Sequence, residues 1–255
     1  MKISVITASY NSALTIRDTI ESVFNQTYNE IEYIIVDGKS NDNTVDIIKE
    51  YEVLFNGRLR WISESDTGLY HAMNKGIAMA TGEIVSILNS DDFFCETFAV
   101  EHIMTVFQNN NDIDAVYANL LYVKKNNTNI ITRRWIVGNQ KAMKTGWDVA
   151  HPTFYVRKDI YEKYGVFDLD YKLSADFEMI LRFLDVHKIK AYYLDEYVVK
   201  MRLGGETSKN IHNFVLQNNE CVQAFRKHKI KVNKYLYLLK RLIPKLFQLF
   251  VVVKI

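Results

Sequence analysis

Short apolar runs alternate with amphipathic segments through the first hundred residues. The runs cover residues 2–7, 31–36, 58–62 and 84–88, and they lead into Thr7, Asp37, Asp66 and Asp91. The segments between them carry apolar residues near helical spacing. This alternation is typical of an α/β fold with a mostly parallel sheet flanked by helices, Rossmann-like in its winding. Ligands of such sheets bind at the carboxyl ends of the strands, so the polar residues there are candidate site residues.

Three helices are expected between these strands. The first is expected to begin at Asn11 or Ser12, with Leu14 among its apolar positions. The second follows the polar residues 40–43, and the third spans residues 70–80.

The fourth run ends in two adjacent carboxylates, Asp91 and Asp92. Adjacent carboxylates repel one another unless a divalent cation or hydrogen-bond donors compensate them. Hard oxygen ligands suit Mg²⁺ or Mn²⁺, which can also hold phosphate oxygens. A second interpretation stays open, because Asp92 precedes a predicted helix over residues 97–107 and could cap it.

The chain has no glycine-rich phosphate loop of the GxGxxG or GxxxxGK[ST] type. The charge of a bound diphosphate would therefore have to be met by a metal at Asp92 and by Lys75. Asp37 follows the second strand, where acids of nucleotide-binding sheets accept hydrogen bonds from a base or ribose.

Several motifs together resemble those of the family 2 glycosyltransferases. They are Thr7, Tyr10 and Asn11, then Gln26, residues 35–42 (IVDGKSND), residues 66–76 (DTGLYHAMNKG), residues 81–83 (TGE) and residues 89–92 (NSDD). The match is close over about the first hundred residues and looser to about residue 210. The resemblance implies a GT-A fold, a nucleoside-diphosphate sugar donor, a divalent metal (Mn²⁺ or Mg²⁺) and transfer with inversion. The sequence departs at Asn89, where many relatives have Asp.

The resemblance also implies roles for particular residues. Asp37 would contact the base, Asp91 the ribose or diphosphate, and Asp92 the metal. The other residues expected to bind the nucleotide or donor are Thr7, Tyr10, Asn11, Asp66, Asn74 and Lys75.

Inverting transfer also needs a base that takes the proton of the acceptor hydroxyl. In similar enzymes an acid at a helix start after the metal motif has this role, and Asp176 stands at such a start with Ser174 as the expected cap. Glu178 is the reserve, although its side chain should point away from that of Asp176. The other interpretation is that both acids only compensate the helix dipole.

An acceptor side is expected over residues 147–167, with His151 and Glu178 as acceptor contacts. A hydrogen-bonded structural role for His151 is the alternative. Residues 204–208 (GGETS) resemble a loop that lies near the active site in relatives, where it is expected to be mobile. Those glycines could also only turn the chain.

Charge is distributed unevenly along the chain. The formal net charge is +2, but residues 226–255 hold nine Lys or Arg and no acid, while residues 1–225 hold 23 bases and 30 acids. We therefore expect a catalytic domain over 1–225, with a nucleotide-sugar half (1–110) and an acceptor half (111–225). Residues 226–255 are then a basic amphipathic tail. An acidic main domain argues against a nucleic-acid binder.

The tail is expected to lie on a membrane surface. The apolar stretch after Lys245 has about ten residues, while a spanning helix needs roughly 20. Its bases would meet anionic headgroups. The alternative is a helix packed on the core or on a second subunit, as in a homodimer. The two cysteines and the absence of a signal pattern indicate a cytoplasmic protein, peripheral on the inner face of the cell membrane.

The sequence thus predicts an inverting, metal-dependent glycosyltransferase of bacterial surface polysaccharide synthesis, such as lipopolysaccharide or capsule. The expected donor is a UDP-sugar, with guanosine as the alternative base. The expected acceptor is a glycan or a polyprenyl-diphosphate-linked saccharide. A non-catalytic membrane scaffold with the same fold is the alternative, against which the four acids Asp37, Asp91, Asp92 and Asp176 argue. A processive synthase would carry several membrane spans and a QxxRW motif, and neither occurs.

Overall fold

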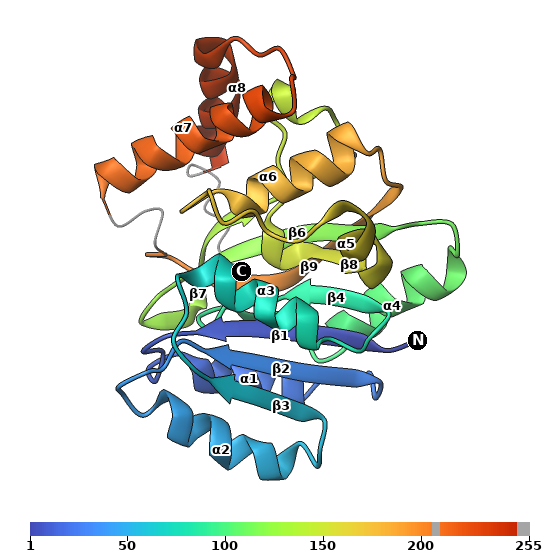
Figure 1. The fold of residues 1–255 in the computed structure, drawn as a ribbon, viewed down its shortest axis with the longest axis vertical. Coiled ribbons are helices and arrows are strands. Elements are labelled where there is room, and N and C mark those ends of the chain that lie inside the picture. The colour runs from blue at the N-terminus through green and yellow to red at the C-terminus, as the bar shows by residue number, and fades with distance from the viewer. Residues whose placement is uncertain (206–209, 249–255) are drawn as a thin grey trace.

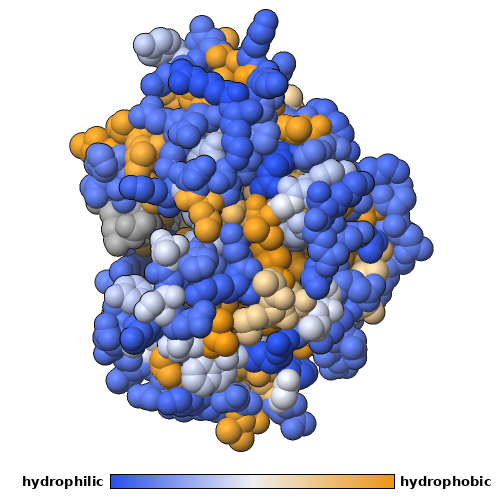
Figure 2. Space-filling model, viewed as in Figure 1, coloured by the Kyte–Doolittle hydropathy of each residue, from blue (hydrophilic) through white to orange (hydrophobic). Residues whose placement is uncertain are grey.

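The computed structural model of the chain describes residues 1–205 and 210–248 (Figure 1). Residues 206–208 of the loop expected near the active site lie outside this range, as do residues 249–255 of the tail. Most of the face shown in Figure 2 is hydrophilic, with apolar side chains in small groups.

The amino-terminal half of the sheet is parallel, as its sequence predicts. Its strands run in the order β3 (Leu59–Ser63), β2 (Ile31–Asp37), β1 (Ile3–Ser9) and β4 (Ile84–Ile87). Ser9 lies opposite Asp37, and Asp37 lies opposite Ser63. The carboxyl ends of these three strands therefore meet at one edge of the sheet.

The second half of the sheet is mixed. β6 (Ala115–Lys124) pairs antiparallel with β7 (Asn127–Trp135) and β8 (Phe154–Arg157), and parallel with β9 (Ala191–Arg202). The short β5 (Phe93–Phe94) pairs with β9. Because β8 also pairs with β4, the two halves form one nine-stranded sheet in the order β3-β2-β1-β4-β8-β6-β9-β5, with β7 beside β6.

Helices cover both faces of the sheet. α1 (Ile16–Phe24), α2 (Thr44–Leu54) and α4 (Ala99–Asn109) share a core with Val5 and Tyr33. α3 (Leu69–Met79), α5 (Lys158–Tyr164), α6 (Ala175–Leu181) and α7 (Ile211–Lys227) share the other core with Ile6 and Ile34. Neighbouring residues of a strand thus enter opposite cores, which is why the strands are continuous apolar runs. Short 3-10 turns at Met143–Thr145 and His151–Thr153 and a π turn at Arg182–Val186 complete the elements.

Two predicted helix starts are wrong by a few residues. α1 begins at Ile16 after Thr15, not at Asn11 or Ser12, and Leu14 is 95% exposed. The loop before α1 is held instead by the second βα loop and the first residue of α2, because the Ala13 N–H donates to Asp42 Oδ2 at 3.1 Å and the Ser12 N–H donates to Thr44 Oγ1 at 2.8 Å. α4 begins at Ala99, two residues later than predicted.

One face of α8 (Lys234–Gln248) packs on the core. Tyr237 is buried, with its ring edge-on to Phe225 at 5.0 Å between centroids. Gly146 makes this approach possible, since it has a φ of +88° and a Cβ there would lie 2.7 Å from the Lys240 carbonyl carbon. The boundary predicted at residues 225–226 falls inside α7. Among the described helices, none has both the length and the apolarity to cross a bilayer.

Candidate active site

Asp37 joins the ends of three strands. Its carboxylate is fully buried and accepts from Ser9 Oγ (3.1 Å), Ser63 Oγ (2.7 Å), the Ser40 N–H (2.9 Å) and Ser40 Oγ (2.5 Å). An ionised carboxylate has about four acceptor directions, and these four donors use them. A base could therefore reach Asp37 only if a serine hydroxyl gave up its bond.

Three other predicted donor residues surround the same strand ends. Tyr10 is 60% exposed, and Asn11 Oδ1 accepts the Asn41 N–H at 2.9 Å. A Cβ on Gly38 would lie 2.7 Å from Asp66 Oδ2 and 3.4 Å from the Tyr10 ring. A larger residue at position 38 would therefore displace the Asp66 carboxylate. Tyr10, Asn11 and Asp66 thus form the rim around buried Asp37.

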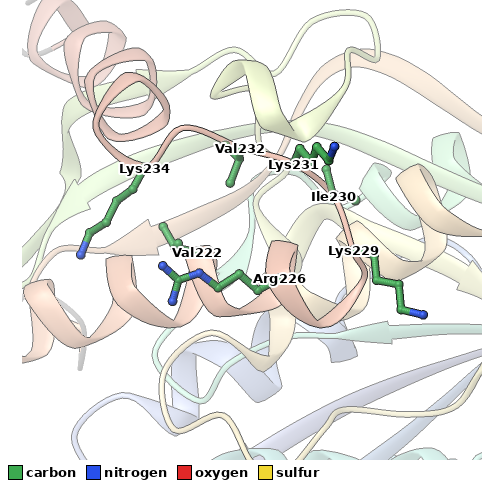
Figure 3. A pocket seen from close by; sticks show the side chains of 7 residues that line it. All are labelled: Val222, Arg226, Lys229, Ile230, Lys231, Val232 and Lys234. Atoms are coloured by element: carbon green, nitrogen blue, oxygen red, sulfur yellow. The ribbon is translucent and has the colours of Figure 1, made fainter.

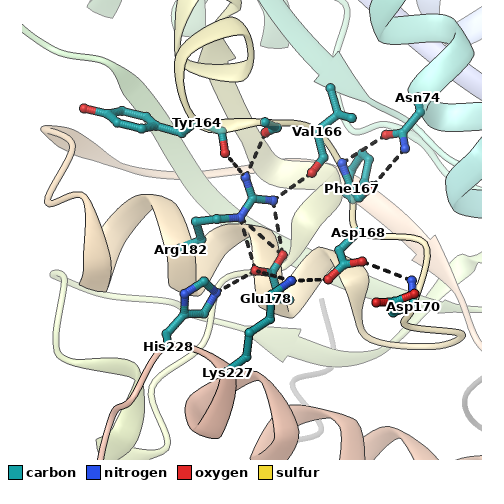
Figure 4. A network of polar contacts seen from close by, with 11 residues as sticks. Asn74, Tyr164, Val166, Phe167, Asp168, Asp170, Glu178, Arg182, Lys227 and His228 are labelled. Atoms are coloured by element: carbon teal, nitrogen blue, oxygen red, sulfur yellow. Dashed lines mark hydrogen bonds and ion pairs between the residues drawn. The ribbon is translucent and has the colours of Figure 1, made fainter.

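The structure does not bring Thr7 or Asn74 to this rim, whereas Lys75 lies beside it, since its Nζ donates to the carbonyl of Ser65, next to Asp66, at 3.1 Å. Thr7 is buried, where its Oγ1 donates to the Leu88 carbonyl at 2.8 Å. Asn74 bonds both backbone polar groups of Phe167, with Nδ2 donating at 2.8 Å and Oδ1 accepting at 3.0 Å (Figure 4). Lys75 forms an ion pair with Glu64 at 2.7 Å. Thr7 and Asn74 thus bind partners inside the fold, and the geometry does not support their assignment to the donor. The role of Lys75 stays a prediction.

Asp92 is fully buried after β4. Its Oδ2 accepts from Asn89 Nδ2 at 2.8 Å, but its Oδ1 has no hydrogen-bond partner among the described residues. Burial, and then the Asp91 carboxylate, raise the pKa of Asp92 well above its usual value. The alternative role as a helix cap does not hold, since Phe98 occupies the cap position of α4.

Asp91 is less buried and lies near positive charge. Burial raises the pKa of its carboxyl group, although the charges of Arg202, Lys125 and His151 lower it in part. Arg202 also donates to the Asp91 carbonyl at 2.6 Å and forms an ion pair with Asp18. No local sequence pattern predicts this contact of Arg202, because Arg202 stands in β9, far along the chain from Asp91.

The two acids fit a divalent cation. Asp92 has a buried carboxylate oxygen without a partner among the described residues, and burial raises the pKa of both acids, with the Asp91 carboxylate raising that of Asp92 further. A bound cation would stabilise the ionised form of both acids. In the described part of the chain, no group of three His, Cys, Asp or Glu could complete a site from protein alone. Mg²⁺ is commonly held by one or two carboxylates together with substrate phosphates. Asp91 and Asp92 suit such a shared site.

A line of contacts connects Asp92 to Asp176. Asn89, which donates to Asp92, places its Oδ1 3.3 Å from His151 Nε2. His151 Nδ1 in turn lies 3.1 Å from Asp176 Oδ2, and the Tyr70 hydroxyl donates to Asp176 Oδ1 at 3.0 Å. The structure therefore brings together five residues from four separate parts of the sequence. Asn89 and Tyr70 stand inside the motifs of the sequence, but no pattern there assigned them this role.

Asp176 remains ionised at neutral pH. Burial alone would raise the pKa of Asp176, but the hydrogen bond and charge of His151, the Phe177 N–H and the Tyr70 hydroxyl together lower it. Its side chain is 25% exposed, so a substrate can reach it. Ser174 precedes the helix as predicted, yet its hydroxyl donates to the Gln217 carbonyl and makes no cap bond.

Glu178 lies on the other side of α6, away from Asp176, as helix geometry predicts. Its buried carboxylate pairs with Arg182 Nη2 at 3.1 Å and His228 Nε2 at 2.6 Å (Figure 4). Arg182 also donates to the carbonyls of Tyr164, Gly165 and Val166. The prediction of Glu178 as an acceptor contact is therefore not supported, because this carboxylate is buried within a structural network.

Known proteins resemble the chain in sequence. Residues 4–165 match the family model described as glycosyl transferase family 2. An uncharacterised glycosyltransferase of Nostoc sp. is 36% identical over 117 residues, which are 46% of this chain and 36% of that protein. An uncharacterised glycosyltransferase of Mycobacterium tuberculosis is 31% identical over 71% of this chain and 68% of its own length. A PGL/p-HBAD biosynthesis glycosyltransferase of Mycobacterium bovis is 25% identical, covering 82% of this chain and 79% of that protein.

Solved structures resemble it in fold. Staphylococcus aureus TarS 1-349 with UDP-GlcNAc superposes with a TM-score of 0.67 at 18% identity, over 94% of this chain and 70% of that one. The mannosyltransferase PcManGT of Pyrobaculum calidifontis, with GDP-Man and Mn²⁺, gives a TM-score of 0.69 at 18% identity, over 94% and 69%. The predicted GT-A fold is confirmed by these glycosyltransferase neighbours. With the family model matching more than half of its length, this chain belongs to glycosyl transferase family 2.

Proposed function

We propose that the chain transfers a sugar from a nucleoside-diphosphate sugar to a hydroxyl group, with inversion and with a divalent metal. The observation that carries this proposal is the line of contacts from Asp92 through Asn89 and His151 to Asp176. One end of this line is a buried carboxylate with an unpartnered oxygen, which suits a cation. The other end is a partly exposed, ionised carboxylate, which can accept a proton from the acceptor hydroxyl.

Asp176 is the proposed catalytic base. It takes the proton of the acceptor hydroxyl while that oxygen bonds to the anomeric carbon, and the bond from this carbon to the diphosphate breaks on the opposite face. Attack opposite the leaving group inverts the anomeric centre. His151 and Tyr70 each hold one carboxylate oxygen and so fix the direction from which Asp176 meets the hydroxyl.

Asp92, with Asp91 beside it, is the proposed holder of Mn²⁺ or Mg²⁺. When bound, the cation stabilises the negative charge of the departing diphosphate. Support comes from the raised pKa values of both acids. Because two carboxylates alone do not fill the coordination shell of such a cation, cation and diphosphate would bind together.

The proposed donor is a UDP-sugar, with its base and ribose at the rim of Tyr10, Asn11 and Asp66 above Asp37. The structural neighbours are complexes with UDP, UDP-GlcNAc and GDP-Man. At less than 20% sequence identity, the sugar and the base bound by these structures are not assigned to this chain. A GDP-sugar is therefore the alternative that the binding experiment must separate.

The proposed acceptor is a glycan or a polyprenyl-diphosphate-linked saccharide of bacterial surface polysaccharide synthesis. His151 is the acceptor-side residue beside the base, at 3.1 Å from Asp176. In this proposal the protein lies on the inner face of the cell membrane through residues 226–255. A homodimer through the same tail is the other possible arrangement.

One observation favours a second function. The carboxylate of Asp37 is fully occupied by hydrogen bonds within the fold, an arrangement that a scaffold protein without turnover would also keep. A non-catalytic membrane scaffold would bind no nucleotide in a metal-dependent way.

Nucleotide binding separates these functions. UDP, GDP, CDP and dTDP are titrated by calorimetry with Mn²⁺ and again with chelator. We expect one nucleotide to bind only with metal, and Asp92→Ala to abolish that binding while the surface control Asp46→Asn keeps it. Absence of binding for all four nucleotides would favour the scaffold.

The base assignment is tested by Asp176→Asn. UDP release from a UDP-sugar is measured with a polyprenyl-diphosphate-linked saccharide present. The variant should bind nucleotide normally and lose about 10²- to 10⁴-fold in kcat, the usual contribution of a general base. An unchanged kcat would show that another group takes the proton.

A further inference from the structure

The connection between α7 and α8 is surrounded by cations. Arg226, Lys229, Lys231 and Lys234 line a pocket of about 360 Å³ together with Val222, Ile230 and Val232 (Figure 3). A neighbouring pocket of about 210 Å³ shares Lys231 and Val232 and adds Lys144 and Lys240. No acid lines either pocket. We refer to these six Lys and Arg residues as the basic patch.

The fold leaves this charge uncompensated. Lys227, beside the patch, pairs with Asp168 and Glu178. By contrast, Arg226, Lys229 and Lys231 have no acidic partner among residues 1–205 and 210–248, and Lys234 reaches only the amide oxygen of Asn219, at 3.0 Å. Surface cations gathered around concave pockets without acids attract anions.

An apolar stripe lies on α8 next to the basic patch. Tyr235, Leu236, Leu239 and Ile243 are 82%, 50%, 54% and 40% exposed. At about 100° per residue these four positions fall within roughly 100° of the helix circumference. Tyr237 and Arg241, which are buried, lie on the opposite side. The helix therefore packs one face on the core and presents an apolar face to solvent.

We propose that the basic patch binds the phosphate groups of anionic lipids while the apolar stripe of α8 enters the membrane interface. This inference rests on the membrane contact in the proposed function, and it identifies the residues that make this contact. Exposed apolar residues beside unpaired cations are typical of helices that lie in the interface of an anionic bilayer. A second copy of the chain fits this face poorly, because the patches of two copies would repel one another.

The test is sedimentation with phosphatidylcholine vesicles, with and without phosphatidylglycerol, using the full chain. We expect binding only to the phosphatidylglycerol vesicles, weakened by salt. The triple variant Arg226→Gln, Lys229→Gln, Lys231→Gln should bind about 100-fold more weakly, since each cation near an anionic surface contributes about fivefold. The matched triple Lys49→Gln, Lys124→Gln, Lys188→Gln should bind as the unmodified chain does.

Two outcomes would overturn the proposal. One is equal binding of both triple variants. The other is that the unmodified chain binds neither kind of vesicle and forms a dimer in light scattering, and that the patch substitutions dissociate this dimer. Metal-dependent UDP binding is measured on the same samples and should not change in the patch variant. If the patch variant loses vesicle binding but still binds UDP, the result concerns this inference alone. If the unmodified chain does not bind UDP, the result concerns only the proposed function.

Discussion

His151 lies between two acceptors. Asn89 Oδ1 faces its Nε2, and Asp176 Oδ2 faces its Nδ1. The amide of Asn89 is oriented by its own bond to Asp92. Both ring nitrogens of His151 therefore have a partner, which fixes the orientation of the imidazole. Asn89 connects Asp92 to His151 through an uncharged amide.

Substitution of His151 by Gln should change both rate and pH dependence. We expect kcat to fall about 100-fold, because Asp176 loses the partner that orients it. The proposed mechanism requires ionised Asp176, and His151 lowers the pKa of this group. Without that contribution the pKa rises, so the acidic limb of the kcat profile should move to higher pH.

The control is His102→Gln, which alters a surface contact with Glu196. Its kcat profile should match that of the unmodified chain. Nucleotide binding should be unchanged in both variants. An acidic limb that stays in place in His151→Gln would mean that His151 does not act on Asp176.

Among the elements, β2 is tied to its neighbours by one buried acid. Glu32 accepts from Ser4 Oγ of β1 at 2.6 Å, from the N–H and Oγ1 of Thr81 at 2.8 and 2.9 Å, and from Arg60 Nη1 of β3 at 3.0 Å. Burial raises the pKa of Glu32, but these donors outweigh it and lower the pKa to about 2. The charged form is therefore stabilised in the folded state.

Glu32→Gln should destabilise the fold by about 2 kcal/mol at neutral pH, the usual value of hydrogen bonds to a charged group. The folded pKa of Glu32 lies below the unfolded value, so its contribution is complete above about pH 4.5 and disappears as the pH falls toward 2. Urea unfolding at several pH values measures this difference. Glu52→Gln, an exposed change on α2, serves as the control, and a pH-independent difference would contradict the prediction.

The helix α7 fixes the start of α6. Glu220 is buried and accepts the N–H groups of Lys172 at 3.0 Å and Leu173 at 2.9 Å, just before the helix that carries Asp176. Glu220→Gln would place an amide NH₂ against one of these donors. We expect kcat to fall about tenfold or more with unchanged nucleotide binding, since small displacements of a reacting group are costly.

The surface change Glu162→Gln on α5 provides the comparison, measured by kcat and by nucleotide calorimetry. A loss of nucleotide binding in Glu220→Gln would indicate general unfolding and not a displaced α6. Equal kcat for both variants would show that α6 keeps its place without this carboxylate.

Local patterns predicted the elements of the first hundred residues well, because each strand is an apolar run followed by a polar end. They failed for Leu14, where side chains of a second loop decide how the chain enters α1. They also could not reveal Arg202, Glu220 or Arg241. Each of these acts on a segment distant in sequence, and only the closed sheet brings the partners together.

At the scale of the molecule, the pairing of β4 with β8 joins the strands of residues 1–110 and those of residues 111–225 into one sheet. We therefore expect a single unfolding transition. Circular dichroism and the fluorescence of Trp61, Trp135 and Trp147 should report the same urea midpoint. Two separate midpoints would show that residues 1–110 and 111–225 unfold independently.

The buried face of α8 affects how the chain can be shortened. Arg241 contacts Cys221 Sγ at 2.6 Å and Asp148 at 3.2 Å, and Asp148 lies three residues before His151. A version of the protein ending at residue 225, made to improve solubility, would lose Arg241 and Tyr237 along with five of the six residues of the basic patch. If such a truncated enzyme were inactive, the cause could be a displaced segment before His151 or the loss of the proposed membrane contact. Point substitutions on the outer face of α8 separate these two causes.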